Sequence, residues 1–259
     1  MKIYQQTKDC SDFDITIGKE GKPSFRVLLP EWIKADGIKF EGLYHTISGK
    51  WRHQGNHVEG SYDVADQLRV DIGIRSRHTD ILVDLSLTNI GGNEISKVWA
   101  DVCTSINHLP GEPSWSNKEF MGNLPLDRAI QGRFWYEQLA PRHLFAITTE
   151  NWVNMHPNSD DPNADLVPLY NFAPSEKAEA IGCAVESLDG NIFCFQAWSN
   201  LSRYCTPSPG NACMHLQPFV TESLSPDETA KIRGLIGIHF GNRIDLKTKI
   251  IGILGRASS

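Results

Sequence analysis

The stretch Gln67 to Asn89, QLRVDIGIRSRHTDILVDLSLTN, decides the fold class of this chain. Apolar residues fall on every second position, at Leu68, Val70, Ile72 and Ile74 and again at Val83, Leu85 and Leu87. A period of two is typical of a β-strand with one buried face. The polar residues His78 to Asp80 between the two runs reverse the chain. The stretch therefore predicts a long antiparallel hairpin with strands over 67–77 and 81–89.

The same alternation continues on the C-terminal side of this hairpin. The turn Ile90 to Asn93 contains two glycines and leads into a predicted strand over 98–106, which extends the hairpin to a three-stranded meander. A second hairpin is predicted over 180–188 and 191–198. It is joined by Asp189-Gly190, a dipeptide that suits a type I′ turn because both central residues there take positive φ.

A last strand is predicted over 228–240, with Ile232, Ile236, Ile238 and Phe240 facing inward. Shorter strands are expected over 24–29, 45–52 and 144–149. No window sustains the i, i+3, i+4, i+7 pattern of a long amphipathic helix, so only short helices are expected, over 118–129 and from Ile244. We predict an all-β, two-sheet antiparallel β-sandwich that forms a single domain over residues 1–259, because sandwiches of this size are commonly one domain.

Charge and hydropathy exclude two classes of partner. The 25 basic and 31 acidic residues give a net charge of −6, with no run of Lys or Arg. A nucleic-acid partner would require a clustered basic face, so none is expected. The longest apolar stretch, 250–254, is far shorter than the roughly 20 residues that span a bilayer, so no membrane partner is expected. Nothing in the sequence indicates an oligomeric state.

Other sequence signals are mostly absent. The first 14 residues lack the pattern of a secretory signal, which predicts a cytoplasmic protein. The six cysteines show no C-x-x-C pair and are interpreted as buried thiols rather than as a disulfide scaffold. The chain contains no G-x-S-x-G elbow, Walker loop, dinucleotide fingerprint or H-E-x-x-H motif, which removes the commonest hydrolase, nucleotide-binding and zincin interpretations.

The first candidate site follows the third strand of the predicted meander. Asp101 and Cys103 lie on the face opposite the apolar residues of that strand, and His108 comes just past its end, before Glu112 and Trp115. Such a face can line a concave pocket, with His108 at its rim as an acid or base. A solvated outer face explains the same pattern equally well.

The second candidate site lies further along the chain. Alternation places Asn211, Cys213 and His215 on one side of their segment. Thiolate and imidazole are preferred ligands of zinc and copper, so a metal-dependent enzyme with ligands His108, Cys213 and His215 is one alternative, with His239 as a further candidate ligand. The closely spaced ligand pairs of structural zinc sites are missing. The preferred interpretation therefore contains no metal and no other cofactor.

Tryptophans beside polar residues indicate a sugar ligand, because an apolar ring face stacks on the indole while the hydroxyl groups take hydrogen bonds. Trp115 and Trp152 lie in the long turn-rich segments 110–132 and 152–174, which are either functional loops or plain surface connections. Packing in a β-core explains such tryptophans equally well. We assign three others to the fold: Trp32, Trp51 and Trp99.

The run Val83 to Gly92, VDLSLTNIGG, is followed by a polar turn and a strand that leads to Asn107-His108-Leu109-Pro110. This arrangement resembles the mid-chain segment of the galactose mutarotase-like superfamily, in which a strand ending in Thr-Asn-x-Gly precedes one that ends at a His-Pro element. The resemblance implies a supersandwich that binds a sugar in its concave sheet and uses an acid–base pair of a His and a carboxylate. By position His108 takes the imidazole role. This chain has His-Leu-Pro where members have His-Pro-aromatic, and it shows no clear counterpart of their C-terminal Glu.

These observations predict a carbohydrate-active enzyme of the epimerase, isomerase or lyase type, acting on a small sugar or sugar acid. His108 and His215 are the candidate acid and base. Candidates for orienting the imidazoles or binding a carboxylate are Asp101, Glu112 and Arg233. The predicted substrate contacts are Trp115, Arg233, His239, Trp152 and Asn211. The alternatives are the metal-dependent enzyme described above and a non-catalytic carbohydrate-binding module that uses the same Trp and Asn residues.

Overall fold

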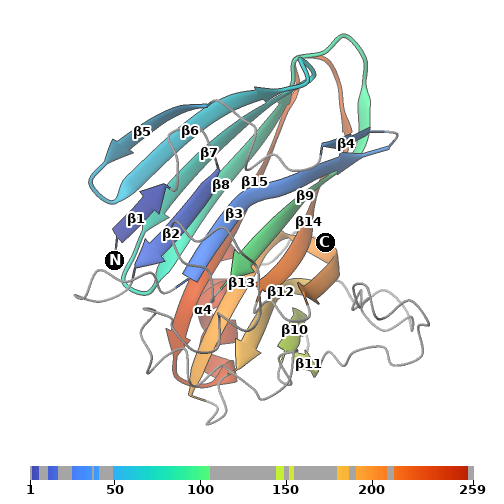
Figure 1. Cartoon of the computed structure of the whole chain (residues 1–259). Coiled ribbons are helices and arrows are strands. Elements are labelled where there is room, and N and C mark those ends of the chain that lie inside the picture. Colours follow the sequence, from blue (N-terminus) through green and yellow to red (C-terminus); the bar gives the residue numbers. More distant parts are fainter. Residues whose placement is uncertain are drawn as a thin grey trace.

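The structure is a computed structural model of the chain (Figure 1). The residues that it describes are 2–5, 11–16, 25–36, 38–40, 49–105, 144–148, 152–154, 180–186, 191–208 and 213–255.

Antiparallel pairing connects fifteen strands of the described residues into one network. In chain order they are β1 (Lys2–Gln5), β2 (Asp12–Thr16), β3 (Phe25–Ala35), β4 (Ile38–Phe40), β5 (Lys50–Gln54), β6 (His57–Val64), β7 (Leu68–Ser76), β8 (Asp80–Asn89), β9 (Ile95–Ser105), β10 (Leu144–Thr148), β11 (Trp152–Asn154), β12 (Ala180–Glu186), β13 (Ile192–Ser208), β14 (Cys213–Leu224) and β15 (Thr229–Phe240). The main path runs β1-β2-β3-β9-β14-β13-β15-β8-β7-β6-β5, while β4 pairs with β3, β12 with β13 and β10, and β11 with β10.

This path folds into two layers around a shared apolar core. Phe13 of β2 and Trp51 of β5 come from opposite ends of the path, yet their ring centroids are 5.1 Å apart. The side chain of Gln5 in β1 likewise lies 3.1 Å from that of His53 in β5. In Figure 1, β5 to β8 form one layer, and β3, β9 and β14 run beside one another in the other. The predicted all-β, two-sheet antiparallel sandwich is confirmed.

Most of the predicted strands are present. β7 and β8 form the predicted hairpin, and β12 pairs with β13 as expected from Asp189-Gly190. The strand over 228–240 is β15, whose Ile232, Ile236 and Ile238 are buried in the core. Phe240 was also predicted to face inward, which is wrong. It is 52% exposed, because it is the last residue of the strand and lies at the margin of the core.

The predicted three-stranded meander is also wrong. β9 does not pair with β8 but crosses to the other layer, where it pairs with β3 and β14. The buried amide of Asn89, the last residue of β8, stabilises this crossing. Its Nδ2 donates to the carbonyls of Asn93 and Leu224, each at 2.8 Å, and its Oδ1 accepts from the Gly91 backbone N–H at 2.9 Å.

The chain crosses between layers a second time beside the first. β14 ends at Leu224, and the following turn leads into β15, which pairs with β8. The backbone of Asn89 also forms hydrogen bonds with this second connection. Its N–H donates to the Glu228 carbonyl, and its carbonyl accepts from the Asp227 N–H. Asn89 therefore forms hydrogen bonds with both crossings and stabilises them.

The helix α4 (Arg243–Leu254) covers the outer face of β13 and β15. The Asn242 side chain caps it by accepting a hydrogen bond from the Asp245 N–H at 3.0 Å. The helix buries Leu246 and Ile250 in a second apolar cluster with Phe193 and Phe195. No helix in the part of the chain that the structure describes is long and apolar enough to cross a membrane.

Charged and titratable side chains surround the contact between α4 and the sheet. The ammonium of Lys249 lies 2.5 Å from the buried carboxylate of Asp80. The ring of His239 lies close by, and its Nε2 is buried without a hydrogen-bond partner among the described residues. Burial, together with the nearby positive charge of Lys249, lowers the pKa of His239 below its usual value. A protonated His239 is therefore unfavourable in the folded state.

We predict that replacing Asn89 by Ala lowers the free energy of unfolding by about 1–3 kcal/mol, because the buried Leu224 carbonyl loses its donor. Urea unfolding measures this change. The matched control is Asn93→Ala, which removes an exposed side chain and keeps the backbone carbonyl that Asn89 contacts. Equal stability of the two variants would contradict the role given to Asn89.

We also predict that His239 makes stability depend on pH. Its folded-state pKa is depressed, so the unfolded chain binds a proton more readily and stability falls as the pH drops below about 6.5. Between about pH 7.5 and pH 5.5 the wild type should lose more unfolding free energy than His239→Gln does. The control His78→Gln changes an exposed histidine and should keep the wild-type pH dependence. A His239→Gln curve parallel to the wild-type curve would refute this prediction.

Candidate functional site

The outer face of β9 and β14 carries the residues of the candidate site. In β9, Val98, Ala100 and Val102 point into the core, so Asp101 and Cys103 point the other way. In β14, Met214 and Leu216 face the core in the same manner, which leaves His215, Gln217 and Phe219 on the outer face. The pairing register places Cys103 directly opposite His215.

A bulge in β3 adds one more side chain to this group. Leu28 pairs with Cys103 and Trp32 pairs with Asp101. Three residues of β3 thus lie across from the single residue Val102, so the strand carries two extra residues there. Glu31 is the last residue of this bulge, and its carboxylate reaches the ring of His215. We call Glu31, Asp101, Cys103, His215 and Gln217 the acid–base cluster.

Two carboxylates lie beside one ring nitrogen of His215. Its Nδ1 is 3.1 Å from Glu31 Oε2 and 3.3 Å from Asp101 Oδ1. Gln217 Nε2 donates a hydrogen bond to the other oxygen of Asp101. The side chains are 18% exposed at His215, 13% at Glu31 and 5% at Asp101, so water reaches the imidazole more readily than it reaches the carboxylates.

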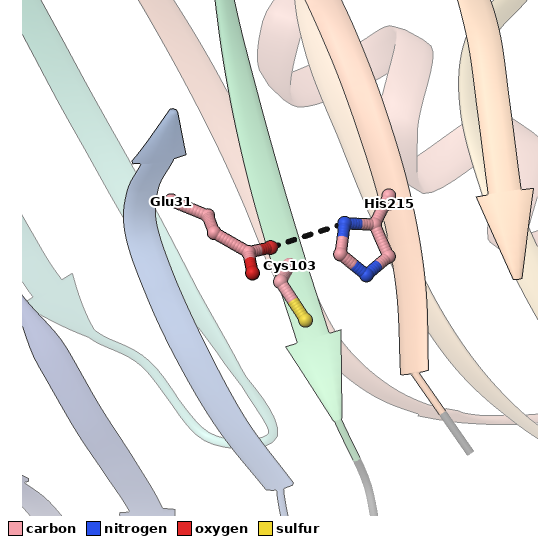
Figure 2. Close-up of side chains that lie close together, drawn as sticks. All are labelled: Glu31, Cys103 and His215. Carbon is pink, nitrogen blue, oxygen red and sulfur yellow. Dashed lines mark ion pairs between the residues drawn. The ribbon is translucent and has the colours of Figure 1, made fainter. Parts of the chain in front are cut away.

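This arrangement determines what the imidazole can do. We assign a proton to Nδ1, because its nearest partners are carboxylate oxygens, which only accept hydrogen bonds when ionised. Figure 2 shows Glu31 directed at Nδ1 and the second ring nitrogen pointing away from that carboxylate. A histidine held in this way by carboxylates can exchange a proton through Nε2 while its charged form is stabilised.

A row of aromatic side chains continues from the cluster along the same outer face. Trp32 pairs with Asp101, and Trp99 pairs with Phe219. The ring centroids of Trp99 and Phe219 are 4.6 Å apart, and Lys34 Nζ lies 5.0 Å from the centroid of Trp32. All four side chains are partly exposed. We call Trp32, Trp99 and Phe219 the aromatic row.

The structure brings together some of the predicted site residues. Asp101 and His215 were placed in separate candidate sites, 114 residues apart, and they lie in contact. His108, Glu112, Trp115 and Asn211 lie outside the described residues. Trp152 is the first residue of β11.

Two other predicted residues lie away from the acid–base cluster. Arg233 and His239 share a face of β15, as predicted, but the Arg233 guanidinium donates to Asp84 at 2.7 Å and His239 adjoins α4. Phe193 of β13 pairs with His239, and Thr206 of the same strand pairs with His215. The extended strand between Phe193 and Thr206 is roughly 40 Å long, so the two histidines lie far apart. The structure therefore does not bring His239 into a ligand set with His215.

The site candidates predicted from the sequence omit five residues of this face: Glu31, Gln217, Phe219, Trp32 and Trp99. Of these, Trp32 and Trp99 were predicted to belong to the fold. Extending the alternation from Cys213 and His215 by one step identifies Gln217. Pro30 interrupts the period of two in β3, which is a signal for a bulge, but no pattern shows which side chain the bulge presents.

A separate hollow of about 380 Å³ lies on the outer face of β5 to β8, in the other layer. Gly73 leaves a gap there between Glu59 and Asp84, its neighbours on either side. The lining residues carry charges of both signs, and Asp84 is already paired with Arg233. These features are typical of a solvated sheet face.

Comparisons with known proteins give a weak structural resemblance. No protein-family model and no curated protein matches the chain. Among solved structures, a putative aldose 1-epimerase from Escherichia coli K12 has 11% identity and a TM-score of 0.45, covering 92% of this chain and 94% of that one. A galactose mutarotase-like protein from Lactobacillus casei has 11% identity and a TM-score of 0.49, covering 92% and 96%. A protein from Synechocystis sp. PCC 6803 has 9% identity and a TM-score of 0.46, covering 89% and 93%. The chain thus resembles galactose mutarotase-like and aldose 1-epimerase proteins weakly, in fold alone.

Proposed function

We propose that the chain is an enzyme that transfers a proton to or from a small sugar or sugar acid, with His215 as the catalytic acid or base. The observation that carries this proposal is the position of His215 Nδ1 at 3.1 Å from Glu31 and 3.3 Å from Asp101. Carboxylates at one ring nitrogen hold the imidazole in one orientation and stabilise its protonated form. Reactions of this kind include epimerisation, isomerisation and elimination.

The aromatic row supports a carbohydrate as the substrate. Trp32 pairs with Asp101, so an indole lies next to the acid–base cluster on the same face. A sugar ring that stacks there presents its hydroxyl groups to the neighbouring carboxylates and to Gln217. The resemblance of residues 83–92 to the galactose mutarotase-like superfamily implies the same class of ligand.

Four residues of the cluster have a role in this proposal. His215 Nε2 exchanges the proton with the substrate, while Asp101 and Glu31 are positioning residues that act through Nδ1. Gln217 fixes the carboxylate of Asp101. Lys34, which lies over the ring of Trp32, can pair with the carboxylate of a sugar acid. This role was predicted for Arg233, which is instead paired with Asp84.

We predict that His215→Gln lowers turnover by about 10²- to 10⁴-fold, the usual contribution of general acid–base catalysis. The assay incubates the protein with a panel of reducing sugars and uronic acids in D₂O, and NMR follows anomer exchange, loss of carbon-bound protons and appearance of unsaturated products. The control His78→Gln changes an exposed histidine of the β7–β8 turn and should keep wild-type rates. Full turnover by His215→Gln would remove His215 from the mechanism.

Asp101→Asn tests the positioning role. The substitution keeps an oxygen that can accept the Gln217 hydrogen bond but removes the negative charge beside Nδ1. We expect a smaller loss of turnover than for His215→Gln and a pH–rate profile displaced to lower pH, because the neutral imidazole becomes easier to form. An unshifted profile with reduced turnover would indicate a purely structural role for Asp101.

A further inference from the structure

Three side chains of the acid–base cluster also form a donor set for a metal ion. One ligand atom each from Glu31, Cys103 and His215 can be chosen so that all three lie within 4.8 Å of one another. They come from three neighbouring strands, β3, β9 and β14, and Figure 2 shows their side chains converging on one region. The thiol is buried and the other two groups are only slightly exposed.

The chemistry of the three donors favours one class of ion. Thiolate, imidazole and carboxylate together are typical of zinc, whereas magnesium and calcium prefer oxygen ligands alone. Two ligands of one tetrahedral zinc ion lie about 3.3–3.8 Å apart, so small side-chain rotations bring the three atoms into range. Three protein ligands leave a fourth position open, as in catalytic zinc sites.

The surroundings of the three donors resemble the outer shell of a metal site. Asp101 Oδ1 contacts the His215 ring at 3.3 Å, and Gln217 in turn holds the second oxygen of Asp101. Carboxylates that contact a ligating histidine orient its ring and strengthen it as a ligand. We propose that Glu31, Cys103 and His215 form a binding site for zinc or a similar thiophilic divalent ion.

This inference shares residues with the proposed function but does not depend on it. A bound ion occupies one nitrogen of His215 and the Glu31 carboxylate, so it competes with the arrangement required for proton transfer by the free imidazole. The site also differs from the ligand set predicted from the sequence, in which the thiolate came from Cys213. Metal binding is measurable without any substrate.

The test is a zinc titration of the full-length chain after dialysis against a chelator, followed by calorimetry and by elemental analysis. We expect one zinc ion per chain and a higher melting temperature with zinc than without it. Cobalt in place of zinc should add a thiolate-to-metal charge-transfer absorption that is absent from Cys103→Ser. Glu31→Gln and Cys103→Ser should each bind zinc at least about 10–100-fold more weakly than the wild type. Removing a residue that only contacts a ligand already costs this much affinity, so removing a ligand itself should cost no less.

Two control variants separate this site from non-specific binding. Cys183→Ala removes a buried thiol of β12, and Glu59→Gln removes an exposed carboxylate of β6. Both should bind zinc as the wild type does. Glu31→Gln preserves the shape of the side chain, so it keeps the test decisive if Cys103→Ser fails to fold.

Two outcomes would overturn the inference: substoichiometric zinc in the wild type, or wild-type affinity in Glu31→Gln. Neither outcome bears on proton transfer, which the sugar-exchange assay with His215→Gln tests separately. Conversely, stoichiometric zinc with weakened variants would support the metal site even if no sugar were turned over.

Discussion

The structure depends on one constraint, the alternation of side chains between the two faces of a continuous sheet. Over most of β7, β8, β9, β14 and β15 the alternate apolar residues are buried in the inner core, and burying a Val, Leu or Ile side chain stabilises the fold by about 1.5–3 kcal/mol. A slip of one residue would turn each apolar row outward, so the core holds the register of every strand. The same register determines which polar residues face outward together, and the acid–base cluster exists because of it.

The cluster also depends on the order of strands in the sheet. β3, β9 and β14 are distant in sequence, and they become neighbours because the chain crosses between layers after β8 and again after β14. Asn89 stabilises both crossings with its side chain and its backbone. A local hairpin arrangement would have left β9 beside β8, and Asp101 would then have had no contact with His215.

Local patterns were sufficient to predict several of the strands and their buried faces, among them β7, β8 and β15, whereas β1, β2, β4 and β6 were not predicted. The alternation over 67–89 and the Asp189-Gly190 turn each depend on neighbouring residues, and the structure contains both hairpins. The polar faces of Asp101 and His215 were predictable for the same reason. Their contact was not, because pairing between β9 and β14 is set by the core as a whole and not by any short segment. The pairing of Arg233 with Asp84 was equally beyond local patterns, because the two residues lie on different strands, 149 residues apart.

The bulge in β3 separates the chemistry of the site from the stability of the sheet. Leu28 and Trp32 keep their partners on β9, so the ladder is continued on both sides of the two extra residues. Glu31 therefore lies outside the paired positions of β3, so its side chain can be replaced while the pairing on either side is preserved. Sequence change there alters the acid next to His215 without a cost in strand register.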